Sequence, residues 1–450
     1  MGDTIVAIST ALGVGAISII RVSGNESISI VNKIFKGKNL EKVDSHTINY
    51  GKIVDDNQEI DEVLVSVMKA PRTFTTEDVI EINCHGGIIT TQKVLELLIR
   101  KGCRLAEPGE FTKRAFLNGR IDLTEAEGIM DLIDAKTENQ RKMAMNKVNG
   151  RVSGMIEDLR NSLAQIISNI EVNIDYPEYD DIEEMTTEMI KDRVGNIENA
   201  INKILKESES GKILKEGIKT SIIGKPNVGK SSLLNLLLEE DKAIVTDIEG
   251  TTRDIVEGTL NLDGIILNMI DTAGIRKTDN IVEQIGVNKS IDLIDKSDLI
   301  LYVLNNNEII SQEEINLYDK IKNKNHIIII NKTDLESKLD LPFEDNNIIK
   351  MSTLNNEGLT ELKDKIKELF NLENIETSDF TYLTNAKDIA ILKDCLESIR
   401  DIRESLNNNV SIDMIEIDIK NIWNKLGEII GVTYEDELID YMFSHFCLGK

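Results

Sequence analysis

The sequence has few of the residues that mark a disulfide-stapled secreted protein or a zinc protein. Its 450 residues include four cysteines, and no two of them stand in a Cys-x-x-Cys spacing: Cys84, Cys103, Cys395 and Cys447. The four histidines do not cluster with them. A disulfide framework or a zinc site is therefore not expected, and a reducing cytoplasm is the simplest location for the chain.

Long apolar runs are also absent. None reaches the roughly 18 residues that a membrane-spanning helix needs. The first twenty residues contain Asp3, are broken by glycines and lack a basic start, so we predict a strand and a loop there instead of a signal peptide. Position 6 is Val6, where an N-myristoylation signal requires Ser or Thr. We therefore expect no membrane partner.

Basic residues are few relative to acidic ones. The chain has 52 Lys and Arg against 79 Asp and Glu, which gives a net charge of −27. Residues 1–150 are nearly neutral, with 19 basic and 21 acidic side chains, so the remainder carries about −25. A protein that grips nucleic acid over its whole surface would be basic. Any contact with RNA should therefore be local, or be made by a partner.

What the sequence does contain is a complete phosphate-binding loop, Gly224–Ser231, with the spacing G-x-x-x-x-G-K-[ST]. The glycines allow a tight backbone path, Lys230 reaches the β and γ phosphates, and the Ser231 hydroxyl can bind Mg²⁺. The apolar run Ile218–Ile223 predicts a strand before the loop, and Ser232–Leu238 predicts a helix whose positive end faces the anion. The alternative, a glycine turn without function, explains none of this context.

Two further motifs indicate the nucleotide. Asn331-Lys332-Thr333-Asp334 follows the predicted strand His326–Ile330, and an Asp there accepts hydrogen bonds from two guanine N–H groups that adenine lacks. Asp271-Thr272-Ala273-Gly274 follows the predicted strand Ile265–Ile270. Asp271 would bind the Mg²⁺ shell, and the Gly274 N–H would meet the γ phosphate. With Ser352 and Thr353 completing the base pocket, the chain is predicted to bind GTP.

The residue that follows Asp271–Gly274 departs from the common GTPase pattern. Many GTPases place Gln there to orient the attacking water, whereas this chain has Ile275, which cannot hydrogen-bond water. Two interpretations stay open on the motifs alone. The chain is either a slow switch that needs an external activator, or it positions the water with a group from elsewhere in its own sequence.

The pattern of apolar residues predicts a multidomain chain. Residues 1–118 alternate strands and helices as an α+β domain, and residues 119–215 have the three- and four-residue apolar spacing of helices. Residues 216–375 alternate strand and helix as an α/β domain, and residues 376–450 are helical again. We therefore predict a GTPase domain inserted into an all-α domain. The strands predicted in the first domain are Ile5–Ser9, Gly15–Arg21, Val63–Met68 and Asp78–Cys84, and its predicted helix is Gln92–Lys101.

Taken together, these segments resemble the MnmE (TrmE) family of tRNA modification GTPases, and the resemblance runs from end to end. Ordinary GTPases lack Pro108–Arg120 (PGEFTKRAFLNGR), which with the terminal Phe446–Lys450 (FCLGK) is the most specific part. The phosphate loop, Thr246–Asp254, Asp271–Arg276 and Asn331–Asp334 also match. The resemblance implies a Ras-like P-loop domain inserted in the helical domain, and an N-terminal domain that resembles folate-binding domains and dimerises.

The family implies a potassium-activated GTPase without an arginine finger. Asn227 would bind K⁺ through its side chain, although by itself it also fits an ordinary turn after Pro226. Backbone carbonyls of Thr246, Ile248 and Thr251 would complete the K⁺ site, and Thr252 would bind Mg²⁺ beside Ser231. Glu283 would be catalytic, orienting water once two G domains meet; alone, it would pass for a solvated loop charge. The implied nucleotide contacts are Asn227, Val228, Gly229, Lys230, Ser231, Ser232, Thr246, Asp247, Ile248, Glu249, Gly250, Thr251, Thr252, Asp271, Thr272, Ala273, Gly274, Asn331, Lys332, Asp334, Ser352 and Thr353.

The family also implies a folate of the 5-formyltetrahydrofolate type, bound at Arg21, Glu81, Arg120 and Lys450. A carboxylate suits the paired donors of a pterin ring, and basic side chains suit the glutamate tail. Position 120 is Lys in some relatives, so Arg120 keeps the charge but not the geometry. Without the family, Arg21 or Arg120 would equally fit an exposed salt bridge. Cys447 would be a reactive thiol near the folate, whereas most such cysteines are buried and inert.

The resemblance implies a homodimer that works with the FAD-dependent subunit MnmG (GidA) as a heterotetramer. Together they would modify the wobble uridine U34 of tRNA at C5, adding a carboxymethylaminomethyl or aminomethyl group. One alternative is a switch GTPase of ribosome assembly without covalent chemistry, which leaves residues 1–120 and the terminal segment unexplained. The other is a folate-dependent one-carbon transferase that GTP regulates. Folate binding by the N-terminal region would exclude the switch.

Overall fold

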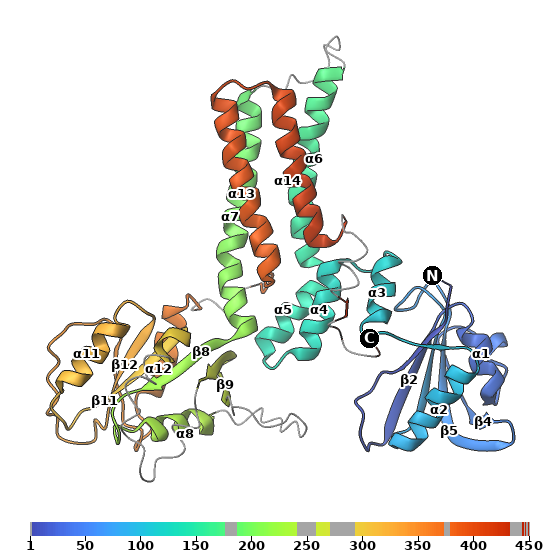
Figure 1. Cartoon of the computed structure of the whole chain (residues 1–450), viewed down its shortest axis with the longest axis horizontal. Helices are drawn as coiled ribbons and strands as arrows, with labels where there is room; N and C mark the ends of the chain where they lie inside the picture. The colour runs from blue at the N-terminus through green and yellow to red at the C-terminus, as the bar shows by residue number, and fades with distance from the viewer. Residues whose placement is uncertain are drawn as a thin grey trace. The chain divides into compact units, whose positions relative to one another are not determined.

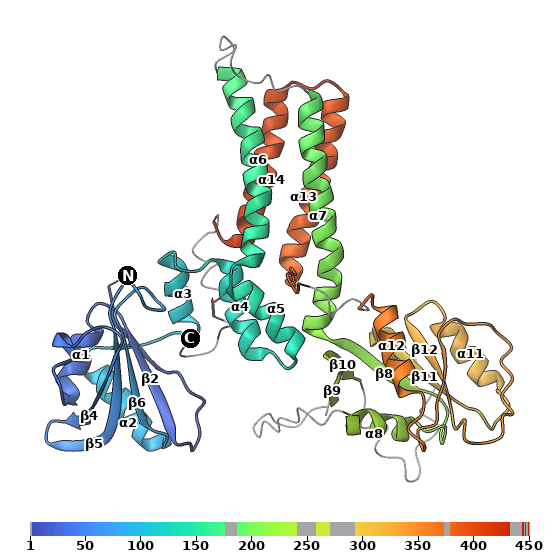
Figure 2. The same cartoon turned by 180° about the vertical axis from the view of Figure 1, so that it is seen from behind.

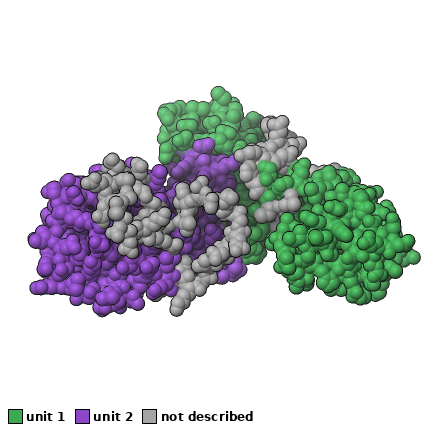
Figure 3. Space-filling view, turned by 60° about the horizontal axis from the view of Figure 1, so that its bottom comes forward, with its two compact units in different colours: residues 1–133, 144–193, 397–450 green, residues 134–143, 194–396 purple. Residues whose placement is uncertain are grey.

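The computed structural model describes residues 2–175, 187–240, 258–270, 293–372 and 379–432, together with 443, 444, 446 and 449 (Figure 1). The chain forms two compact units, coloured in Figure 3. Unit 1 contains Met1–Ile133, Ala144–Arg193 and Glu397–Lys450, and unit 2 contains Asp134–Met143 and Val194–Leu396. Over these described ranges, no helix is long and apolar enough to cross a membrane.

The first part of unit 1 is a mixed sheet with the strand order β3-β4-β5-β6-β2-β1-β7. β7 pairs parallel to β1, and the other neighbours pair antiparallel. The strands are β1 Ile5–Ile8, β2 Ile17–Ser23, β3 Phe35–Lys36, β4 Thr47–Asp55, β5 Gln58–Met68, β6 Val79–His85 and β7 Arg104–Leu105. The helices are α1 Ser27–Ile34, α2 Ile88–Arg100 and α3 Glu110–Leu117, with a short 3-10 turn at Leu40–Lys42.

One face of this sheet is covered and the other is open. Side chains from α1 and α2 join one core with alternate residues of the strands, among them Val63, Val65 and Val67 of β5. Because successive strand residues point to opposite faces, Leu64 lies on the other side, where it is 45% exposed. Ile48 and Tyr50 of β4 are 68% and 65% exposed. The open face therefore carries apolar side chains in contact with solvent.

The helical part contains α4 Leu123–Asp134, α5 Glu138–Val148, α6 Arg151–Asp175, α7 Thr187–Glu216, α13 Ala386–Asn407 and α14 Ile412–Ile430. In unit 1, α14 packs along α6, side by side in Figures 1 and 2. The three- and four-residue apolar spacing forms the contact, with Ile156, Leu163 and Ile170 of α6 fully or nearly fully buried. Helices thus occur both before and after the α/β part, while the predicted domain bounds stay predictions.

The α/β part of unit 2 is a sheet with the order β13-β12-β11-β8-β10-β9, in which only β9 pairs antiparallel. Its strands are β8 Ile218–Ile223, β9 Gly258–Leu262, β10 Ile265–Met269, β11 Leu299–Asn305, β12 His326–Asn331 and β13 Ile348–Lys350. Its helices are α8 Lys230–Glu240, α11 Gln312–Ile321 and α12 Leu359–Leu369.

Helices cover both faces of this sheet, which is why β11 and β12 read as continuous apolar runs. α8 and α12 contribute to one core and α11 to the other. The loops at the carboxyl ends of β8 and β12 carry the phosphate-loop and guanine motifs, where open α/β sheets bind ligands. The predicted fold class is confirmed: an α+β part, helices, and an inserted P-loop α/β domain.

Candidate functional site

The phosphate loop connects β8 to α8 and depends on its two glycines. Gly224 has φ +145° and Gly229 has φ +103°, backbone values that residues with a Cβ rarely adopt. A Cβ at Gly224 would lie 2.4 Å from the Val303 carbonyl oxygen, and one at Gly229 would lie 2.1 Å from Asn331 Nδ2. α8 begins at Lys230, so its positive N-terminal end opens on the loop. The loop is therefore built to receive phosphate.

The guanine motif is bonded directly to the phosphate loop. Asn331, the last residue of β12, donates from Nδ2 to the Val228 carbonyl oxygen at 2.9 Å, and its Oδ1 accepts from the Thr353 N–H at 3.1 Å. Lys332 Nζ donates to the Asn227 carbonyl oxygen at 2.7 Å. The structure thus brings together two motifs that are about a hundred residues apart in the chain.

The carboxylate of Asp334, the last residue of the guanine motif, is also oriented. The Ser352 hydroxyl donates to Asp334 Oδ1 at 2.7 Å, and Ser352 itself is completely buried. Asp334 is exposed, which suits a group that accepts from the edge of a guanine. In the phosphate loop, Lys230 Nζ donates to the carbonyl oxygens of Gly224 at 2.7 Å and Lys225 at 2.6 Å. Bonds therefore bring part of the predicted set together around the phosphate loop, while its binding of a guanine nucleotide stays a prediction. The residues that these bonds join are Asn227, Val228, Lys230, Asn331, Lys332, Asp334, Ser352 and Thr353.

Several predicted site residues lie outside the described residues. They are Thr246, Asp247, Ile248, Glu249, Gly250, Thr251 and Thr252, then Asp271, Thr272, Ala273 and Gly274, and also Ile275, Glu283, Cys447 and Lys450. Ile270, the residue immediately before Asp271, is described, and its N–H donates to the Thr220 carbonyl oxygen at 2.9 Å. The roles of these residues stay predictions.

In unit 1, Arg21 of β2 and Glu81 of β6 are directly opposite each other in the sheet. Arg21 Nε donates to Glu81 Oε1 at 2.9 Å, and the two side chains are 20% and 24% exposed. The pair is therefore reachable from solvent. Gly449 comes to the same place, because its carbonyl oxygen accepts from Arg21 Nη1 at 3.3 Å and from the Ser9 hydroxyl at 3.0 Å.

Aromatic contacts also hold the end of the chain against α3. The Phe443 ring centroid is 6.0 Å from that of Phe116 and 4.9 Å from that of Phe446. Gly109, at the start of α3, leaves room for this contact, since a Cβ there would lie 2.5 Å from the Phe443 carbonyl oxygen. Phe446 therefore lies beside α3 and Gly449 beside Arg21, while the predicted thiol, Cys447, is outside the described residues.

The remaining predicted folate residue and the other cysteines have different surroundings. Arg120 stacks on Phe74, with its guanidinium carbon 5.2 Å from the ring centroid, and no contact between Arg120 and the Arg21–Glu81 pair is recorded among the described residues. Burial raises the pKa of the Cys84 and Cys103 thiols to about 12. These two cysteines are therefore protonated and unreactive at neutral pH.

The motif Pro108–Arg120 contains a charged cluster that the sequence reasoning missed. Arg114 of α3 is 1% exposed and bonds to three carboxylates: Asp3 at 2.8 Å, Glu77 at 3.0 Å and Glu110 at 3.0 Å. Burial alone would raise the pKa of Glu110, but hydrogen bonds from Arg104, the Glu107 N–H and Arg114 hold it below its ordinary value. Glu110 and Arg114 are an i,i+4 pair, but Asp3 and Glu77 are far from them in sequence, so no local pattern could reveal the whole cluster.

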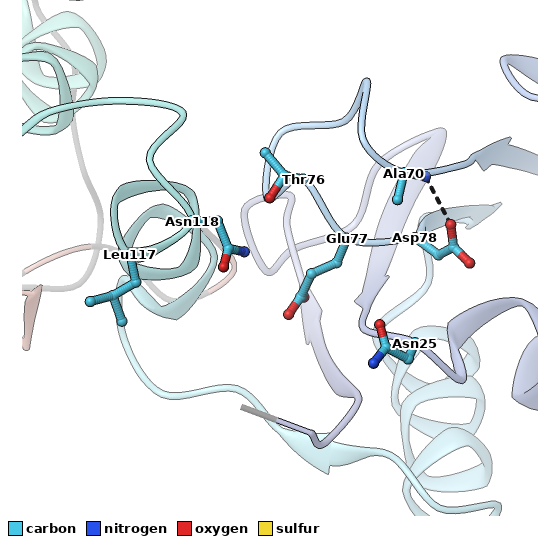
Figure 4. Close-up of a pocket in the computed structure, with 7 residues that line it drawn as sticks. All are labelled: Asn25, Ala70, Thr76, Glu77, Asp78, Leu117 and Asn118. Atoms are coloured by element: carbon cyan, nitrogen blue, oxygen red, sulfur yellow. Dashed lines mark hydrogen bonds between the residues drawn. The ribbon is translucent and has the colours of Figure 1, made fainter.

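A cavity of about 520 Å³ lies beside this cluster (Figure 4). Its lining is mostly polar and comes from the loop before β6, the start of α1 and the end of α3: Asn25, Ala70, Thr76, Glu77, Asp78, Leu117 and Asn118. Glu77 accepts from Arg114 and from the Ser23 hydroxyl, and Asn118 Nδ2 donates to the Thr75 carbonyl oxygen. Arg21, Glu81 and Arg120, the predicted folate residues that the structure describes, are not among its lining residues.

Comparison with known proteins places these sites in context. A model described as "MnmE helical domain" matches residues 123–447, and one described as "GTP-binding protein TrmE N-terminus" matches residues 4–120. A protein of Bacillus licheniformis named tRNA modification GTPase MnmE is 53% identical over 100% of both chains. Another of that name, from Staphylococcus haemolyticus, is 51% identical over 100% of this chain and 99% of its own. The G domain of the T. maritima FeoB iron transporter is 24% identical over 34% of this chain and 98% of its own, with a TM-score of 0.25.

Proposed function

Because this chain belongs to the MnmE family of tRNA modification GTPases and is a GTP hydrolase, we propose that its GTP hydrolysis supports modification of the tRNA wobble uridine U34 at C5. It would act in the cytoplasm as a homodimer, together with the FAD-dependent subunit MnmG in a heterotetramer. One observation supports the GTPase part of this proposal: Asn331 of the guanine motif is hydrogen-bonded to Val228 of the phosphate loop.

Potassium is the proposed activator. Asn227 is exposed, has a left-handed backbone with φ +63°, and is held by the Lys332 bond to its carbonyl oxygen. Its side-chain oxygen would bind K⁺, together with backbone carbonyls of Thr246, Ile248 and Thr251. K⁺ would supply the positive charge near the β and γ phosphates that a finger arginine supplies in other GTPases. Mg²⁺ would be held by Ser231 and Thr252.

The proposed hydrolytic mechanism assigns water orientation to Glu283. Ile275 stands where other GTPases have Gln, and an aliphatic side chain neither donates to nor accepts from water. A carboxylate can accept a hydrogen bond from the attacking water and so orient the lone pairs of that water. Asp334 would select guanine while Lys230 and the Gly229 backbone hold the phosphates. Each role belongs to a residue of this chain, so no separate activating protein is required.

The proposed chemical site lies in unit 1. The partly exposed Arg21–Glu81 pair fits the donor and acceptor edges of a folate such as 5-formyltetrahydrofolate. The bond from Arg21 to Gly449 supports a site that includes the terminal segment, with Lys450 and the Cys447 thiol as further members. Arg120, stacked on Phe74, would contact the same ligand only at a distance from this pair.

The proposed homodimer would form through the open face of the N-terminal sheet. Ile48, Tyr50 and Leu64 expose apolar surface on adjacent strands, and Tyr50 and Leu64 are directly opposite in register. Apolar side chains gathered on an open face mark an association surface. The open face also contains Arg21 and Glu81, so a second copy would approach the proposed folate site.

The deciding experiment follows tRNA by mass spectrometry after incubation with this protein, MnmG, GTP, K⁺, FAD, NADH, a folate donor and glycine or ammonium. A mass increase on U34 that disappears without MnmG or without GTP is the expected result. The matched control is Lys230→Ala, which should lose the product while keeping the fold. Unmodified uridine under every condition would overturn the proposal, and product formed without MnmG would favour an independent one-carbon transferase.

A further inference from the structure

The start and the middle of the phosphate loop are held by different elements. The middle, at Asn227 and Val228, is bonded to the guanine motif through Lys332 and Asn331. The start is held by an ion pair, in which Lys225 Nζ lies 3.0 Å from Glu314 Oε2 of α11. Lys225 is the second residue of the loop, and neither it nor Glu314 has a role in the nucleotide contacts described above.

Glu314 is fixed in place by bonds beyond the ion pair. Its Oε2 accepts from the Ser311 N–H and from the Ser311 hydroxyl, both at 2.8 Å, which closes a capping box at the start of α11. Its carbonyl oxygen accepts from the Tyr302 hydroxyl at 2.9 Å, and Tyr302 is a completely buried residue of β11. The carboxylate is therefore a rigid anchor point with 6% of the residue exposed.

Capping does not explain why this anchor carries a charge. A glutamine at the third helical position closes a capping box as well as a glutamate does. A buried carboxylate costs desolvation energy unless a cation and hydrogen bonds compensate it. The ammonium group of Lys225 is the cation that compensates it here. The positive end of α11 also favours a carboxylate in its first turn, but the group that is paired directly with the Glu314 charge is the phosphate-loop Lys225.

The backbone of Lys225 is bonded to a functional side chain of the loop. The Lys225 carbonyl oxygen accepts from Lys230 Nζ at 2.6 Å, so the position of Lys225 influences where the Lys230 ammonium group lies. Pro226, whose ring fixes φ, is all that separates Lys225 from Asn227. The Asn227 carbonyl oxygen is in turn held by Lys332. The three residues thus form a short, stiff bridge between α11 and the guanine motif.

We propose that the Glu314–Lys225 ion pair positions the start of the phosphate loop for GTP hydrolysis, by fixing the placement of Lys230 and Asn227. Both residues are positioning residues, because neither side chain has to touch the nucleotide. The inference needs only the GTPase activity of the chain. It stands whether or not the proposed K⁺ site or the proposed tRNA chemistry is correct.

The test compares steady-state GTP hydrolysis by Glu314→Gln, Lys225→Met and the double variant in the full-length protein. Gln keeps the capping box and leaves no unpaired charge, so Glu314→Gln should retain its melting temperature yet lower kcat about tenfold, as expected for a lost charge-assisted bond. Lys225→Met should lower kcat similarly, with some loss of melting temperature because it leaves the buried Glu314 carboxylate without its cation. GDP affinity should change less than about threefold. Lys225→Arg should restore most of kcat, and the double variant should be no worse than the poorer single variant, since both remove one interaction.

The control is Lys322→Met, which removes an exposed ion pair with Asp319 at the other end of the same helix and should leave hydrolysis unchanged. An unchanged kcat in Lys225→Met would overturn the proposal. So would losses in the two single variants that add up in the double variant, because they would act independently. A fall in melting temperature with an equal loss of GDP and GTP affinity would show a purely structural pair, and would also overturn it.

Discussion

The side-chain amide of Asn331 donates to the carbonyl oxygen of Val228 at 2.9 Å, although 103 positions separate the two residues. Asn331 is 1% exposed, and its amide oxygen is occupied by the Thr353 N–H. One side chain therefore connects the phosphate loop, the guanine motif and the segment that follows β13. The segments predicted to recognise the base and to bind phosphate are consequently tied to each other by this one side chain.

Replacing Asn331 with alanine should weaken both functions at once. The Val228 carbonyl and the Thr353 N–H would lose their partner, and each unsatisfied buried group costs about 1–3 kcal/mol. We expect the Kd for GTP and for GDP to rise at least tenfold, measured with a fluorescent guanine nucleotide. Asn325→Ala, at an exposed position just before β12, is the matched control and should bind normally. An Asn331→Ala protein with unchanged affinity would contradict the role given to this bond.

The ion cluster around Arg114 should dominate the stability of the N-terminal part of unit 1. Arg114→Met leaves Asp3, Glu77 and Glu110 without their shared cation, and breaking such a buried pair costs about 3–5 kcal/mol. Urea unfolding should show this loss. Arg100→Ala removes an exposed pair with Asp55 and should change the unfolding free energy by less than about 1 kcal/mol. Equal effects of the two substitutions would refute the cluster's importance.

Low pH should destabilise the folded protein by protonating Glu110. Its folded pKa is lower than its unfolded pKa, so folding favours the ionised form. The resulting stability is present above the unfolded value, about 4.3, and is lost as pH falls through the folded value. We expect urea midpoints to decline below about pH 4 in the native protein, and Glu110→Gln to be less stable at pH 7 with a weaker acid dependence. A pH profile that this substitution leaves unaltered would disprove the assignment.

GTP turnover should be markedly faster in K⁺ than in Na⁺ at equal ionic strength, because the smaller ion does not match the spacing of the proposed carbonyl ligands. Asn227→Ala should reduce the K⁺ rate to the Na⁺ rate while leaving GTP binding within about threefold. Phosphate release is the measurement, with Asn235→Ala on the exposed face of α8 as control. The same rate in both salts would exclude a specific cation site.

Charge on the open sheet face should separate the proposed homodimer. Leu64→Asp introduces a carboxylate opposite Tyr50, where a second copy would have to bury it. Sedimentation analysis should show monomer at concentrations where the native protein is a dimer. Ile309→Asp, at a position that is 78% exposed in unit 2, should leave the association unchanged. A dimer that survives the first substitution would place the interface elsewhere.

The sequence was sufficient to predict the features that depend on local spacing. Buried runs such as β8 and β12, followed directly by glycine or Asn-Lys motifs, predicted a P-loop α/β domain, and apolar residues at three- and four-residue steps predicted α6 and α14. β4 was harder, because Ile48 and Tyr50 are apolar yet lie on the open face, so the alternation does not indicate which side is buried. We did not predict it.

Contacts between distant segments could not be read from spacing at all. Lys225 and Glu314 lie 89 positions apart, and each alone is an ordinary charged residue. The Arg114 cluster joins residues 3, 77, 110 and 114. These charges come together only once the sheet and α3 have folded. Burial then makes each carboxylate depend on the nearby cation, because a buried charge without a partner is unfavourable.

The bond from the Ser9 hydroxyl to the Gly449 carbonyl oxygen spans 440 positions, and it sets an order of events during protein synthesis. Ser9 leaves the ribosome long before Gly449 does. The contact that Gly449 makes with Arg21 can therefore form only once the chain has been made as far as residue 449. A product truncated just after the α/β part would carry the whole phosphate loop but would lack this contact, so it could hydrolyse GTP without supporting the chemistry proposed beside Arg21.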